Sequence, residues 1–356
     1  MGNPKSELIC EYQDSAAGFL RMQSSSMHDD GSIITVPEDV EMTQGSFVNA
    51  QGLKLATYSW ALKQQSTPRG IVFLLHGYGA HTQFEYMHPT APGEPHTKFE
   101  GTIVDGCVRA GFVVHSLDHQ SHGRSEGVDG LRAYFNKFSD LADEATDYIE
   151  TVLLAEDRWK ELPVFLWSVS MGGATALAMA RKRPSAFAGL VLYAPMISLE
   201  LVRQQEVAFG IKNAHLEVLA GPLSHLLPTV PISKAARNTV HPKSQDEFDN
   251  DPLTYKGAVR NRVGEQFLTV SSELLGGGLK DVRTPFVTYH SIRDTFTDPF
   301  GSQRLAEMAE VAPEDKTYVR VGTGLDIDAD IWHALGCEPG HDKILVHALE
   351  WVTSRV

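Results

Sequence analysis

Ser170 is the residue whose surroundings most clearly suggest chemistry. Residues 164–167 form a short apolar run that predicts a buried strand, and residues 174–180 are rich in good helix formers. Ser168 and Gly172, two positions either side of Ser170, are small enough for strand and helix to cross closely. Such a turn lifts the serine hydroxyl clear of the sheet, and the first N–H groups of the helix point at negative charge forming beside it. The pattern therefore favours a nucleophilic serine.

Ser168 is a second candidate for the nucleophile. It stands where a turn of this kind usually has glycine, and its hydroxyl lies near that of Ser170. Only Ser170 has small residues on both sides at the required distance, so we prefer Ser170.

A serine hydroxyl is nearly inert at neutral pH until a base removes its proton. In a doubly wound sheet the partners follow in the order Ser, Asp or Glu, His, each at the carboxyl end of a strand. Asp294 follows a predicted strand at residues 285–289, and His333 follows one at residues 317–321 by way of a loop. We expect Asp294 and His333 to complete a triad with Ser170.

Both partners have competitors. Asp298 stands close to Asp294, and a loop aspartate is often only a cap or a turn former. His341 and His347 belong to the start and the interior of a terminal amphipathic helix, where surface positions explain them more simply. The agreement of three positions with one geometry favours Asp294 and His333.

Acyl transfer also needs N–H donors for the oxyanion of the tetrahedral intermediate. The N–H of Met171, directly after Ser170, is one expected donor. The other is expected from the turn at residues 76–79, after the first buried strand, and Tyr78 is its most suitable residue because the flanking glycines let the backbone approach.

Strands and helices alternate along most of the chain, which predicts a mostly parallel, doubly wound α/β sheet covered on both faces. A hairpin is expected at residues 47–60, buried strands at 71–75, 112–117, 164–167, 189–193, 285–289 and 317–321, and helices at 99–110, 137–154, 301–310 and 341–352. The alternation stops at about residues 196–282, which contain several prolines and apolar helical segments such as 216–227. That stretch is too long for a plain loop, so we expect a mostly helical lid insertion.

The N-terminal residues 1–44 are polar and lack sustained periodicity, so we expect an extension outside a domain that spans residues 45–356. The first residues fit the N-myristoylation pattern at Gly2, and Cys10 can carry a palmitoyl chain. One acyl chain holds a protein to a membrane only marginally, so the pair would matter together. A chance match is the alternative explanation, because a glycine after the first methionine is common.

Composition excludes several function classes. The 31 Lys and Arg against 45 Asp and Glu give a net charge of −14, which disfavours a nucleic-acid partner. The three cysteines, Cys10, Cys107 and Cys337, show no CxxC spacing, which favours a reducing compartment over a disulfide framework. No apolar run approaches the ~20 residues of a membrane span, and the first residues lack a signal-peptide core, so we expect a cytoplasmic protein.

A dense cluster of His115, Asp118, His119 and His122 raises the question of a metal site. Its spacing matches neither HExxH nor the usual zinc ligand sets, and a histidine-rich loop at a strand end accounts for it. We expect neither a metal nor a cofactor.

Several motifs lie along the chain: LHGYG at residues 75–79, DHQSHGRSEG at 118–127, LPVFLWSVSMGG at 162–173, DPL at 251–253, Arg293-Asp294 and WHAL at 332–335. Together they resemble the monoacylglycerol lipase and lysophospholipase group of the α/β-hydrolase superfamily. The resemblance covers roughly residues 45–356 and implies an α/β-hydrolase fold, a triad of Ser170, Asp294 and His333, oxyanion donors at Tyr78 and Met171, and a lid that forms an apolar tunnel for an acyl chain. The sequence departs from the group at Ser168 and Ser121, where the group tends to have glycine.

These observations predict a serine hydrolase that cleaves the carboxylic ester of a single-chain lipid, either a monoacylglycerol or a lysophospholipid, with transient contact to a membrane surface. A small-molecule carboxylesterase or an acyltransferase of the same group would use the same triad. A non-catalytic ligand-binding protein on this scaffold is the alternative from another class, but such proteins commonly lack a triad member and all three are present here. The sequence leaves the oligomeric state open.

Overall fold

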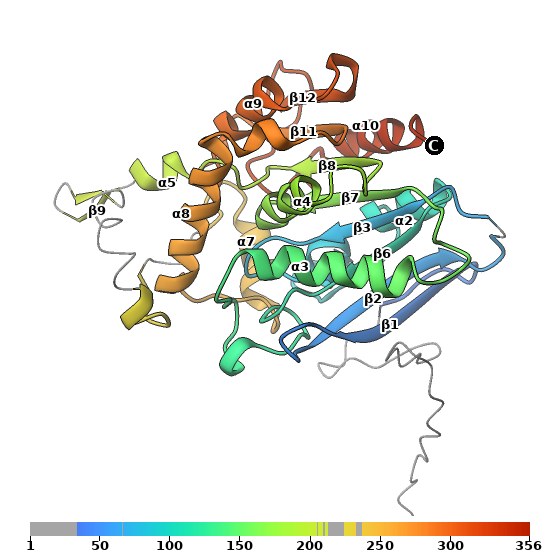
Figure 1. The fold of residues 1–356 in the computed structure, drawn as a ribbon, viewed down its shortest axis with the longest axis horizontal. Helices are drawn as coiled ribbons and strands as arrows, with labels where there is room; N and C mark the ends of the chain where they lie inside the picture. The colour runs from blue at the N-terminus through green and yellow to red at the C-terminus, as the bar shows by residue number, and fades with distance from the viewer. Residues whose placement is uncertain (1–33, 66, 205, 209–210, 213–223, 233–236) are drawn as a thin grey trace, which may run out of the picture.

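The computed structural model describes residues 34–65, 67–204, 206–208, 211–212, 224–232 and 237–356. Its centre is an eight-stranded sheet with the strand order β1-β2-β6-β3-β7-β8-β11-β12. Figure 1 shows helices packed on both faces of this sheet. The predicted α/β-hydrolase fold, with a mostly parallel sheet, is confirmed.

The strands of the sheet are β1 (Val40–Val48), β2 (Lys54–Leu62), β6 (Val113–Leu117), β3 (Ile71–Leu75), β7 (Val164–Val169), β8 (Gly189–Tyr193), β11 (Phe286–Ser291) and β12 (Lys316–Val321). The β1–β2 and β2–β6 pairs are antiparallel, and all the other pairs are parallel. The central strands are continuous apolar runs because helices cover both of their faces. Their carboxyl ends lie at one edge of the sheet, where chemistry-bearing loops can meet.

Two hydrophobic cores lie on the two faces of the sheet. On one face lie α3 (Ser139–Tyr148), which continues into a π-helical turn (Ile149–Leu153), α4 (Met171–Lys182) and α9 (Pro299–Met308); on the other lie α2 (Ile103–Arg109) and α10 (His341–Thr353). Alternate residues of β3 serve the two cores, with Phe73 and Leu75 on the α4 side and Val72 and Leu74 on the α2 side. This is the period-two alternation that a pleated strand requires.

The predicted insertion lies between β8 and β11. Its described elements are α5 (Glu200–Gln204), the short pair β9 (Glu206–Ala208) and β10 (Ile211–Lys212), α7 (Pro242–Asn250) and α8 (Asn261–Leu275). Most of the helical segment expected at residues 216–227 lies outside the described residues. Helix α8 anchors the insertion, because Val263, Phe267 and Leu274 are buried in the core on the α4 side.

Short elements complete the fold: α1 (Thr82–Tyr86), β4 (His88–Pro89), β5 (His96–Lys98), and the 3₁₀ turns at Val128–Gly130, Gly278–Asp281 and Pro313–Asp315. The helix expected at residues 99–110 begins only at Ile103, because the chain before it turns out of β5 and Thr102 caps the helix. No helix in the described part of the chain has the length and apolar character needed to cross a bilayer.

The N-terminal boundary is a correction to the expected extension of residues 1–44. Strand β1 begins at Val40, and the side chains of Ile34 and Val40 are buried in the core on the α2 side. Thr35 also forms a bridge with Lys98. The segment looked polar because β1 is an edge strand that is only partly covered, so polar residues alternate through it. Gly2 and Cys10 lie outside the described residues.

Candidate active site

Ser170 occupies the turn between β7 and α4 in a backbone conformation that L residues avoid, with φ +52° and ψ −114°. Its neighbours hold it there. The Ser170 N–H donates to the carbonyl oxygen of Tyr193 at 2.9 Å, and its own carbonyl accepts from the Met196 N–H at 2.9 Å. The carboxyl end of β8 and the loop after it therefore fix the strained turn.

Ser168 lies inside the sheet on β7. Its side chain is fully buried, and its hydroxyl donates to the carbonyl oxygen of Val191 at 3.3 Å. A substrate cannot reach this hydroxyl without separating β7 from β8. Ser170 is partly accessible at the end of the same strand.

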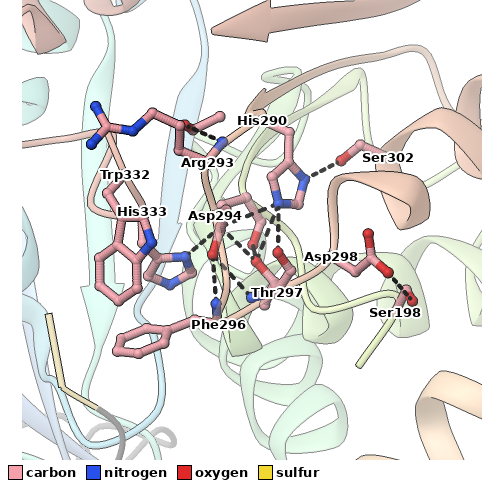
Figure 2. A network of polar contacts seen from close by, with 12 residues as sticks. Ser198, His290, Arg293, Asp294, Phe296, Thr297, Asp298, Ser302, Trp332 and His333 are labelled. Atoms are coloured by element: carbon pink, nitrogen blue, oxygen red, sulfur yellow. Dashed lines mark hydrogen bonds and ion pairs between the residues drawn. The ribbon is translucent and has the colours of Figure 1, made fainter. Parts of the chain in front are cut away.

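Asp294 and His333 meet at the edge of the sheet, 39 residues apart in the chain. The Nδ1 of His333 lies 2.6 Å from Oδ2 of Asp294. Figure 2 shows that Asp294 is held in its loop by further donors. The N–H groups of Phe296 and Thr297 donate to Oδ1 at 2.7 and 3.1 Å, and the Thr297 hydroxyl donates to Oδ2 at 2.9 Å. The carboxylate is thus oriented before any substrate binds.

Asp294 and His333 each favour the charged form of the other. Burial alone would raise the pKa of the Asp294 carboxyl, but His333 and His290 hold that pKa below its ordinary value. Burial likewise lowers the pKa of His333, but the facing Asp294 carboxylate, together with Glu338 and Glu85, outweighs this effect, so the net shift of the His333 pKa is upward. An ionised Asp294 favours the imidazolium form of His333, as a general base requires after it takes a proton.

His290 is a residue of this site that sequence reasoning missed. Its buried ring lies on the other side of Asp294, with Nε2 3.2 Å from Oδ2. Its Nδ1 lies 2.8 Å from the hydroxyl of Ser302 on α9 (Figure 2). A histidine within a buried strand is usually a core residue, so its type and position alone gave no signal.

The turn after β3 lies against Ser170. A Cβ atom placed on Gly77 would lie 3.5 Å from Cβ of Ser170, so the Gly77-Tyr78 peptide is beside the serine. Side-chain contacts hold Tyr78 itself: its hydroxyl donates to the carbonyl oxygen of Ala133 at 3.1 Å, and its ring packs edge-on against Phe267 of α8. The turn is therefore supported from the insertion side.

Two side chains, the buried His76 and the partly buried Glu85, fix this turn from behind, and neither contact was predicted. Nδ1 of His76 lies 2.8 Å from the Gly77 carbonyl oxygen, and its Nε2 accepts the His119 N–H at 3.0 Å, so Nδ1 carries the proton of a neutral ring. Burial lowers the pKa of His76 to about 3. Glu85 of α1 accepts the Gly77 N–H at 3.3 Å, and burial raises its pKa.

The histidine-rich cluster has structural partners. Asp118 accepts the Tyr58 hydroxyl at 3.0 Å and the Thr82 N–H at 2.9 Å, and His119 Nδ1 lies 2.8 Å from Glu144. No group of three or more His, Cys, Asp or Glu side chains suited to a metal occurs in the described part of the chain. The loop also contains Ser121, which adopts φ +66° where the resembling group tends to have glycine.

The profile of the hydrolase family described as serine aminopeptidase, S33, matches residues 93–324. The chain therefore belongs to this family of α/β-hydrolases. Together with its monoglyceride lipase relatives, the match identifies an ester hydrolase. The match includes Ser170 and Asp294 and ends before His333. Within the superfamily the chain is similar to several monoacylglycerol lipases.

Human monoglyceride lipase is 28% identical over 312 residues, which cover 86% of this chain and 89% of that protein. Caffeoylshikimate esterase from Arabidopsis thaliana is 26% identical over 332 residues, covering 90% of each. A solved structure of a soluble variant of monoglyceride lipase from Saccharomyces cerevisiae, in complex with a substrate analog, superposes with a TM-score of 0.68 at 18% identity, over 90% of this chain and 96% of that one. This last likeness shows the fold.

Proposed function

We propose that this protein hydrolyses the carboxylic ester of a single-chain lipid, such as a monoacylglycerol or a lysophospholipid, through Ser170, His333 and Asp294. The observation that carries the proposal is the 2.6 Å contact between Asp294 and His333, at the same edge of the sheet as a strained serine between β7 and α4. The relatives named monoglyceride lipase support the substrate class.

The reaction proceeds through an acyl-enzyme. Ser170 Oγ attacks the ester carbonyl carbon while His333 Nε2 takes its proton, and the backbone N–H groups of Tyr78 and Met171 stabilise the oxyanion. The ester C–O bond then breaks, and His333 returns the proton to the leaving alcohol. In the second half a water attacks the acyl carbon, His333 takes its proton and delivers it to Ser170 Oγ as the carboxylic acid leaves.

The insertion of residues 196–282 supports a lipid substrate, and we assign it the role of lid. It exposes large apolar side chains: Leu226 is 79% exposed, Leu227 48%, Val230 41% and Ile232 39%. Such a concentration suits transient contact with a membrane or lipid aggregate, from which a single-chain ester can enter.

Labelling with a fluorophosphonate tests the nucleophile. Wild type is expected to label and to hydrolyse 1-oleoylglycerol, and Ser170→Ala to do neither. An unlabelled wild type, or equal labelling of the variant, contradicts the assignment. A panel of 1-oleoylglycerol, 1-oleoyl lysophosphatidylcholine and p-nitrophenyl butyrate then ranks the substrates by kcat/KM.

A small-molecule carboxylesterase is the second candidate, favoured by the relative named caffeoylshikimate esterase. Adding a hydroxycinnamoyl ester to the panel separates the two: a higher kcat/KM for that ester than for 1-oleoylglycerol would replace the lipid proposal. Product analysis with a competing alcohol distinguishes hydrolysis from acyl transfer, since only a transferase gives the new ester as its main product.

We also propose a cytoplasmic location with N-terminal acylation at Gly2 and Cys10, on the sequence pattern alone. Metabolic labelling with a myristate analogue is expected to mark wild type and to fail in Gly2→Ala. An unlabelled wild type would refute the anchor without bearing on the catalytic proposal.

A further inference from the structure

Glu338 is a fully buried carboxylate that takes no part in the proposed mechanism. It lies in the turn between His333 and α10. Its Oε2 accepts two backbone N–H groups, from Trp332 at 2.5 Å and from His333 at 3.1 Å. Both bonds hold the peptide units that carry the candidate base. Burying a carboxylate costs free energy unless its oxygens accept hydrogen bonds, so we ask what function the buried position of Glu338 has.

The other oxygen of Glu338 faces the insertion. Its Oε1 accepts the side-chain amide of Asn238, 100 residues earlier in the chain, at 2.7 Å. A flip of the Asn238 amide would break two hydrogen bonds, because its Oδ1 accepts the N–H groups of Val240 and His241 at 3.1 and 2.8 Å. Asn238 therefore presents its NH₂ group to Glu338, and one carboxylate joins the insertion to the histidine loop.

We propose that Glu338 is a positioning residue for His333, and that Asn238 couples the insertion to the catalytic base through it. The inference rests on the proposed function, since it takes His333 as the base. With the backbone of His333 held on one side and its Nδ1 held by Asp294 on the other, the imidazole has little freedom to leave the geometry that proton transfer requires. Displacement of the insertion at Asn238 would loosen this hold.

The negative charge of Glu338 should also affect the pH dependence of activity. Three carboxyl groups from separate segments raise the pKa of His333: Asp294 after β11, Glu338 before α10 and Glu85 on α1. Nε2 of His241 lies 3.8 Å from Glu338 on the insertion side. Removing the charge of Glu338 takes away one of the groups that favour the imidazolium form, so the acidic limb of activity should move to lower pH.

A charge-swap cycle tests the arrangement. In Glu338→Gln the amide oxygen can still accept both backbone N–H groups, but its NH₂ opposes the NH₂ of Asn238. In Asn238→Asp two carboxylates face each other at hydrogen-bond distance. In the double variant the amide of residue 338 donates to the carboxylate of residue 238, so the contact is restored with reversed polarity. Glu161→Gln is the matched control, because it removes one negative charge from an exposed position.

The readouts are kcat and KM for p-nitrophenyl butyrate, the pH profile of kcat/KM, and Tm. We expect kcat to fall about tenfold in Glu338→Gln and about 100-fold in Asn238→Asp, and to recover to within about fivefold of wild type in the double variant, with KM little changed throughout. The acidic limb of Glu338→Gln should lie at lower pH than that of wild type. Glu161→Gln should match wild type in every readout.

An active wild type whose Glu338→Gln variant keeps kcat and the acidic limb, whether or not Tm falls, would overturn the positioning role. A double variant no better than the poorer single variant would overturn the coupling to Asn238. A wild type that neither hydrolyses esters nor labels with fluorophosphonate would overturn the proposed function itself, and this inference with it.

Discussion

A Cβ atom on Gly172 would lie 2.1 Å from the carbonyl oxygen of Leu75, at the point where the start of α4 passes the end of β3. Backbone atoms cannot yield to such a contact as a flexible side chain can. We therefore expect Gly172→Ala to lower the free energy of unfolding by about 3 kcal/mol or more and to abolish labelling of Ser170. Chemical denaturation and fluorophosphonate labelling measure the two effects.

Gly93→Ala is the control for this substitution. Gly93 has φ +83° and open space around it, so the added methyl group incurs only the conformational cost, about 1 kcal/mol. Equal effects of the two substitutions would mean that the close approach of Gly172 to Leu75 is unimportant.

Asp294→Asn should leave the loop folded and remove most of the activity. The amide oxygen can still accept the N–H groups of Phe296 and Thr297, but the NH₂ group then faces Nδ1 of His333 and forces the wrong tautomer. We expect kcat to fall roughly 10⁴-fold, measured with a soluble ester. Asp298→Asn is the matched control, because Asp298 caps α9 and asparagine caps helices equally well. Comparable losses in both variants would contradict the role of Asp294.

Ser168→Ala separates the two candidate serines. The substitution removes only a buried hydroxyl that donates to the carbonyl of Val191, so we expect a loss of about 1 kcal/mol in stability and full fluorophosphonate labelling. Denaturant titration and labelling stoichiometry check the two expectations. Loss of labelling without unfolding would return Ser168 to the candidates for the nucleophile.

The pH dependence of activity should follow from His333, the proposed base. Burial lowers its pKa and Asp294 raises it, and the net position is above the ordinary 6.5. Protonated His333 cannot act as a base, so kcat/KM should rise with pH through a midpoint above 6.5. The stability that this group contributes has the opposite trend: it is fully present below the unfolded-state pKa and is lost as pH rises through the folded-state value. A midpoint below 6.5 in the pH profile would refute this account.

The exposed apolar residues of the insertion should matter only at a lipid surface. We expect the double substitution of Leu226→Ser and Leu227→Ser to lower the hydrolysis of 1-oleoylglycerol in vesicles about tenfold and to leave the hydrolysis of p-nitrophenyl butyrate unchanged. Val346→Ser, at a 57% exposed position on α10, is the control and should change neither rate. Equal loss on both substrates would point to damage to the fold.

Most strands and helices could be predicted because the residue types of each element depend on how far that element is buried. The strands β3, β7, β8 and β11 are buried on both faces, and such burial requires a nearly continuous run of apolar residues. The edge strand β1 was assigned to the extension for more than half its length, because a partly covered strand mixes polar and apolar residues. Its pairing with β2, not its composition, makes it part of the sheet.

The sequence by itself determined the turn at Ser170 and the chain order of Ser170, Asp294 and His333, because spacing between strand ends and small residues at a crossing are local properties. Only the tertiary structure decided what surrounds them. The hold of Glu338 on the His333 backbone, its link to Asn238 and the place of His290 beside Asp294 depend on hydrogen bonds and close approaches that form when the chain packs. The residue type of a carboxylate or an imidazole does not show whether the side chain faces water or another functional group. The folded structure determines its partners.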